Sequence, residues 1–142
     1  MFYEIHQLTE QLLYIRWIAQ AQPNCHPEGE YIADLRHRFD TATQPLYIVS
    51  DLRHGKITNV RILQQLGKLT FHPNFGGGTA FTENFTTTIY VSIFARFSAE
   101  AKRENDIFSS LSEALAHLES LKAGVTEGVD WEAFAQSLTD PA

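Results

Sequence analysis

Polar and basic side chains follow directly after the apolar segment 46–49, where a strand would end and a helix would begin. From residue 52 to residue 82 the chain carries basic residues but no Asp or Glu, although its net charge is -6. The first turn of a helix has free backbone N–H groups and a positive dipole end, which favour a negatively charged ligand. We therefore expect an anion-binding site in this turn, with Asp51 orienting Arg53 or capping the turn. Its candidate residues are Asp51, Arg53, His54, Lys56 and Thr58.

A simpler interpretation of the same segment is a solvated turn in which Asp51 accepts hydrogen bonds from backbone amides. The segment is not a P-loop, because it lacks the pattern G-x-x-x-x-G-K-[ST]. The glycine triplet at 76–78 does not fit a phosphate loop either, because it precedes a predicted strand instead of following one. We expect a loop over 71–78, either a plain turn or a cover for a pocket.

The other reactive side chains form no recognisable catalytic or metal-binding motif. The six histidines include no H-x-x-x-H pair, which a zinc site on a helix would need. Cys25 and His26 are neighbours, so in an extended loop their side chains point apart and cannot act as a dyad. Ser50 is not in a G-x-S-x-G elbow. No catalytic residue is predicted, and we expect a protein that is not an enzyme and binds no metal ion or cofactor.

An aromatic set lies in the segment 86–97. Its β-branched residues favour a strand, whereas apolar residues at i+4 spacing favour a helix, and we expect the helix. Such a helix could line an apolar ligand pocket or a dimer interface, although stripes of this kind are more often part of a core. The candidate pocket-lining residues are Tyr90, Phe94 and Phe97.

The elements that position these residues alternate between strands and helices. The pattern predicts an α/β fold with a single mixed sheet of four to five strands, helices packed against it, and a short C-terminal helix. Ser110 and Glu113 have the spacing of a capping box, which predicts the start of the last core helix. The predicted strands are 2–8, 11–18, 46–49, 79–81 and 106–109, and the predicted helices are 27–41, 58–66, 86–97 and 110–123.

Length and composition narrow the class of protein. A chain of 142 residues with 44% apolar residues can bury a core of its own, and no apolar run approaches the roughly 20 residues that span a bilayer. The single cysteine and the absence of a signal-peptide pattern predict a cytoplasmic protein. Its acidity argues against nucleic-acid binding. We expect a domain over 1–123 and an acidic tail over 124–142, whose short helix at Trp131 docks on its own subunit or on a neighbour.

Three segments together resemble one known family. They are the strand ending in Asp51 (46–53), the helix that follows it (58–66), and the closing strand and helix (106–118). This order is similar to the STAS-like (SpoIIAA-like, anti-sigma-factor antagonist-like) family, in the branch related to Sec14-type lipid-binding folds. The resemblance extends over roughly residues 2–122. It implies a non-enzymatic binding or regulatory domain, which we expect to be a homodimer with a protein partner.

The same resemblance bears on regulation and on a second possible function. Members of the broader family carry a phosphorylatable Ser or Thr, usually after an Asp, at the start of the helix following the central strand. The nearest position here is Thr58, which follows Ile57, so we expect the usual phosphoserine switch to be missing. The alternative is a carrier or sensor of a lipid or other apolar anionic small molecule, bound beneath the helix 86–97 with its anionic head at Arg53 and Lys56.

Overall fold

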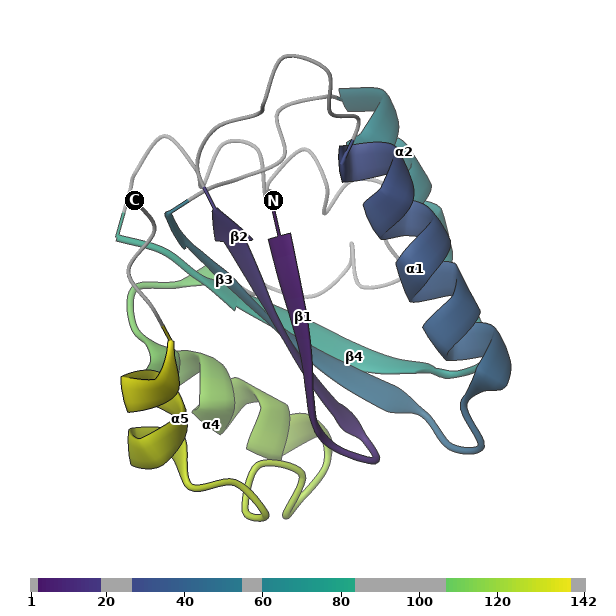
Figure 1. The fold of residues 1–142 in the computed structure, drawn as a ribbon. Helices are drawn as coiled ribbons and strands as arrows, with labels where there is room; N and C mark the ends of the chain where they lie inside the picture. Colours follow the sequence, from purple (N-terminus) through teal and green to yellow (C-terminus); the bar gives the residue numbers. More distant parts are fainter. Residues whose placement is uncertain (1–2, 19–26, 55–59, 84–106, 139–142) are drawn as a thin grey trace.

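The computed structural model of the chain describes residues 3–18, 27–54, 60–83 and 107–138. Its centre is one five-stranded sheet in which the strands lie in sequence order, β1-β2-β3-β4-β5 (Figure 1). β1 runs antiparallel to β2, and all the other neighbouring pairs are parallel. The predicted α/β fold with a single mixed sheet is therefore confirmed. The strands are β1 (Tyr3–Thr9), β2 (Leu12–Ile18), β3 (Leu46–His54), β4 (Phe75–Phe81) and β5 (Ile107–Phe108).

Helices cover both faces of the sheet. One face packs against α1 and α2, and the other packs against α4 and α5 (Figure 1). The connections from β2 to β3 and from β3 to β4 carry α1 and α2, as crossovers between parallel strands require. The described helices are α1 (Pro27–Thr41), α2 (Val60–Leu69), α4 (Leu111–Leu121) and α5 (Trp131–Ser137).

The side chains of β2 divide the interior into two cores. Leu13, Ile15 and Trp17 pack with the buried residues of α1, whereas Leu12 and Tyr14 pack on the side of α4 and α5. All five side chains are buried, and each is worth roughly 1.5–3 kcal/mol of hydrophobic stabilisation. β2 is therefore covered on both faces.

The predicted end of β3 and the predicted start of β4 are wrong. The sequence predicts that the strand ends at Val49, but β3 continues to His54. The reason is pairing on both sides, since Asp51 lies opposite Arg16 of β2 and opposite Phe81 of β4. Asp51 and Arg53 thus belong to a central strand and not to a turn.

The glycine triplet also lies in a strand and not in the predicted loop. β4 begins at Phe75, and Gly77 and Gly78 pair with Tyr47 and Ile48 of β3. Gly76 has a packing role, because a Cβ at this position would come within 2.6 Å of Tyr47 Cζ. The missing side chain therefore makes room for an aromatic ring of the neighbouring strand.

The C-terminal elements close the second core. One half of the predicted capping box is confirmed, because the Ser110 hydroxyl accepts a hydrogen bond from the backbone N–H of Glu113 at the start of α4. In the other half, the Glu113 carboxylate accepts from the backbone N–H of Ser109 and not from that of Ser110. The chain then turns back, and α5 packs on the sheet of its own chain. The ring of Phe134 meets Tyr14 edge to face, with a centroid separation of 4.8 Å, and Trp131 packs beside them.

Candidate functional site

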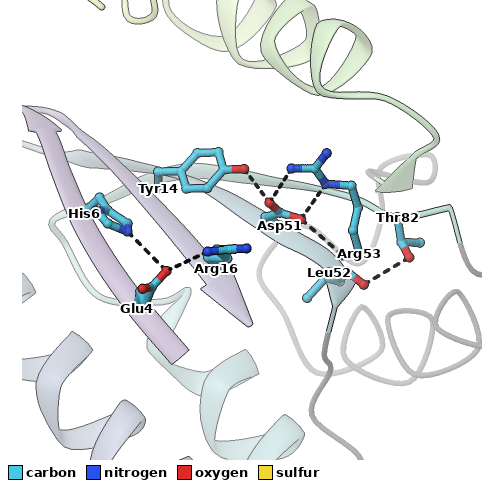
Figure 2. A network of polar contacts seen from close by, with 8 residues as sticks. All are labelled: Glu4, His6, Tyr14, Arg16, Asp51, Leu52, Arg53 and Thr82. Atoms are coloured by element: carbon cyan, nitrogen blue, oxygen red, sulfur yellow. Dashed lines mark hydrogen bonds and ion pairs between the residues drawn. The ribbon is translucent and has the colours of Figure 1, made fainter. Parts of the chain in front are cut away.

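A row of charged residues crosses the sheet near the carboxyl ends of β2 and β3. Glu4 of β1 lies opposite Arg16 of β2, Arg16 lies opposite Asp51 of β3, and Asp51 lies opposite Phe81 of β4. Figure 2 shows these charged side chains together with Tyr14 and Arg53. Ligands of open α/β sheets bind outside the carboxyl ends of the strands, so this row marks the edge where a site is expected.

Asp51 is the centre of the row. Its side chain is 0% exposed, yet both oxygens are satisfied. Oδ2 accepts hydrogen bonds from Tyr14 Oη at 2.5 Å and from Arg53 Nη2 at 2.9 Å. Oδ1 accepts from Arg53 Nε at 3.0 Å and from the Arg53 backbone N–H at 3.1 Å. A buried carboxylate with a forked guanidinium partner and a phenol donor is held in one orientation.

The same contacts fix the charge of each group. Burial alone would raise the pKa of Asp51, but the hydrogen bonds from Arg53 and Tyr14 outweigh burial and hold that pKa below its ordinary value. Burial and the adjacent Asp51 charge raise the pKa of Tyr14, and the hydrogen bonds to Asp51 raise the pKa of Arg53. Near neutral pH Asp51 is thus an anion, Tyr14 is neutral and Arg53 is a cation. None of the three therefore titrates near pH 7, where general acid–base catalysts are most effective.

Arg53 extends from this network toward solvent. Its guanidinium carbon lies 5.1 Å from the centre of the Phe81 ring, within the range of a cation–π contact. The side chain is still 36% exposed. The neighbouring backbone is also held, because Thr82 Oγ1 donates to the carbonyl of Leu52 at 3.2 Å (Figure 2). Arg53 is therefore a cation with a fixed orientation and an accessible side.

A second charged group lies on β1 and β2, and the sequence did not reveal it. Arg16 Nη1 donates to Glu4 Oε1 at 3.3 Å, and His6 Nε2 lies 3.5 Å from the same oxygen (Figure 2). The Arg16 side chain is only 4% exposed. One feature of the sequence could have identified Arg16: it is an arginine in a predicted strand whose other residues are apolar. A charged residue in such a strand is seldom buried unless it has a partner.

The structure places the predicted anion-site residues as follows. Arg53 donates two side-chain hydrogen bonds to Asp51. This is the contact expected if Asp51 orients Arg53. His54 is exposed at the end of β3, where it lies opposite Ile18 of β2. Lys56 and Thr58 lie outside the described residues, and so do the candidate pocket residues Tyr90, Phe94 and Phe97 together with the predicted helix 86–97. These positions stay predictions.

The described residues contain neither a metal centre nor a membrane-spanning helix. Among residues 3–18, 27–54, 60–83 and 107–138, no group of three His, Cys, Asp or Glu side chains is arranged to hold a metal ion. Within the same ranges, no helix has the length and apolar character needed to cross a bilayer. No protein-family model, no curated protein and no solved structure matches the chain. The resemblance to the STAS-like family is therefore a prediction from sequence pattern.

Proposed function

We propose that the chain is a non-enzymatic, STAS-like binding or regulatory domain that recognises an anionic group at the carboxyl end of β3. The observation that carries the proposal is the state of Arg53, which is held by Asp51 and Phe81 but remains 36% exposed. A cation that is already oriented loses little conformational entropy when a ligand binds, and this increases affinity.

The geometry of Arg53 leaves one side of its guanidinium for a ligand. Nε and Nη2 donate to Asp51, whereas Nη1 has no partner among the described residues. The nearby charge of Asp51 reduces the net attraction for an anion. Recognition would therefore depend on the directed Nη1 donors and, from the sequence, on Lys56.

The proposal favours binding over catalysis for a chemical reason. Asp51 is buried and accepts hydrogen bonds on both oxygens, so it orients Arg53 and has no free lone pair directed at a substrate. Thr58 lacks the preceding Asp of the family phosphosite, so recognition in our proposal does not use a phosphoserine switch. The proposal also includes a cytoplasmic homodimer with a protein partner, which the single cysteine and the family resemblance support.

A thermal-shift titration with inorganic phosphate at constant ionic strength tests the proposal. Phosphate should stabilise the wild-type protein, and Arg53→Ala, alone or with Lys56→Ala, should lose most of that shift. The matched control is Arg38→Ala, because Arg38, like Arg53, is partly exposed and pairs with an aspartate, in this case Asp34 of α1. The readout is the shift caused by phosphate, since Arg53→Ala also removes the partner of Asp51 and lowers the starting melting temperature. An equal phosphate shift in the wild type and the Arg53 variants would refute the proposal.

The alternative function is a carrier or sensor of a lipid or other apolar anionic small molecule. It depends on Tyr90, Phe94 and Phe97, which lie outside the described residues, so it stays a prediction. Native mass spectrometry of the purified protein would test it, because a carrier should retain a lipid and a bare chain mass would argue against one.

A further inference from the structure

Two buried nitrogen atoms lie beside the same carboxylate without satisfying their hydrogen-bonding capacity. In the described part of the chain, Arg16 Nε and His6 Nε2 are shielded from solvent and have no hydrogen-bond partner. Both residues are neighbours of Glu4, at 3.3 Å from Arg16 Nη1 and 3.5 Å from His6 Nε2. Charge-assisted N–H···O bonds are ordinarily about 2.7–2.9 Å long, so Glu4 is a poor partner for both.

Among the described residues, the other carboxylate beside Arg16 already has its own hydrogen-bond donors. Asp51 lies opposite Arg16 in the register of β2 and β3, but its oxygens accept from Tyr14 and Arg53. Arg16 cannot avoid the cost of a buried charge by losing a proton, because a guanidinium stays charged in proteins. A buried cation with an incomplete set of partners is costly. Arg16 therefore keeps an unused capacity to bind an anion.

Glu4 is placed to give way to such an anion. Its side chain is 29% exposed on the edge strand β1, whereas the Arg16 side chain is 4% exposed and fixed within the sheet. The carboxylate of Glu4 can turn toward water at little cost, while the guanidinium of Arg16 stays in place. The ring of His6 is also held, because Phe134 of α5 packs against it edge to face at 5.3 Å.

We infer that Arg16 and His6 form a binding site for an oxyanion of the carboxylate or phosphate class, with Glu4 as an internal competitor. The ligand takes the place of the Glu4 carboxylate and accepts from the Arg16 guanidinium in the forked geometry that Glu4 does not achieve. This site uses no atom of Arg53, so it does not depend on the function proposed above.

The variant Glu4→Gln tests the inference, because the inference predicts a gain in anion affinity and not a loss. Removing the competing charge should tighten the binding of inorganic phosphate or of acetate by about tenfold, measured by calorimetry of the full chain at constant ionic strength. A tenfold gain corresponds to roughly 1.4 kcal/mol, close to the strength of one charge-assisted hydrogen bond. Which of the two probes gains affinity identifies the class of ligand.

Two controls separate the site from general charge effects. Asp34→Asn makes the same charge change at a partly exposed pair on α1 and should leave both affinities unchanged. Arg16→Lys introduced into Glu4→Gln should reduce the gain, because a lysine lacks the forked donors of the guanidinium. If Glu4→Gln binds both probes no more tightly than the wild type, or if Asp34→Asn gives the same gain, the inference is overturned.

Discussion

Asp51 shows how a buried charge is kept in this protein. Its carboxylate is excluded from water, and the donors that stabilise it come from one neighbouring strand, through Tyr14, and from Arg53 two residues later in its own strand. Breaking a buried pair of this kind costs several kcal/mol, because the remaining group keeps its desolvation cost. Asp51 is therefore a structural requirement for the orientation of Arg53.

Asp51→Asn should lower the free energy of unfolding by roughly 2–4 kcal/mol at neutral pH. The folded-state pKa of Asp51 lies below its unfolded value of about 3.9, so the ionised carboxylate stabilises the fold above that pH. This contribution is lost as the pH falls through the folded-state pKa. Urea unfolding from pH 7 to pH 3 should show the difference between wild type and variant shrinking below about pH 4.

The control for this experiment is Asp34→Asn, which breaks a partly exposed pair with Arg38 and should cost less than about 1 kcal/mol. A difference between wild type and Asp51→Asn that stays constant down to pH 3 would show that the carboxylate charge of Asp51 contributes no stability.

At the scale of elements, local signals in the sequence were enough for some segments and misleading for others. The helix α1 could be predicted because Tyr31, Leu35 and Phe39 recur on one face, and α4 could be predicted from its cap. β3 was predicted too short because Asp51 and Arg53 are polar. The strand continues because Asp51 pairs with both neighbouring strands and His54 pairs with β2. Pairing across strands is a tertiary effect, which overrides local propensity.

Two of the three glycines of β4, Gly76 and Gly78, give a matched pair for testing this strand. Gly76→Ala should destabilise the protein by about 1–3 kcal/mol, because the new Cβ would overlap the ring of Tyr47. Gly78→Ala should change stability by no more than about 0.5 kcal/mol, since its Cβ would lie 3.5 Å from the Phe75 ring, an ordinary contact. Chemical denaturation measures both. Equal tolerance of the two substitutions would favour the loop that the sequence predicts.

At the scale of the whole molecule, the sheet brings together charged residues from three strands. Glu4, Arg16 and Asp51 are far apart in the sequence and become neighbours only through the register of β1, β2 and β3. Asp51 and Arg53 could be proposed from the sequence because they lie together after an apolar run. Tyr14, Arg16 and their contacts could not, because they depend on which residues the register places side by side.

Near the carboxyl ends of β2 and β3, this acidic protein therefore has two arginines that each form an ion pair with a carboxylate. Each arginine is paired, Arg16 with Glu4 and Arg53 with Asp51, so the edge carries little net charge from these groups. Recognition of an anion here depends on the directions of the remaining donors more than on a general positive field. Binding should therefore discriminate between oxyanions and chloride at equal ionic strength.

The most direct test of this account is an NMR titration that follows the arginine Nε–H signals of the full chain as inorganic phosphate replaces chloride. The account predicts saturable shifts for the Arg53 signal, with the signal of Arg38 on α1 unchanged. A saturable shift of the Arg16 signal would add support for the second site. If the Arg53 signal does not move, or moves only in parallel with Arg38, then the carboxyl end of β3 is not an anion-binding site.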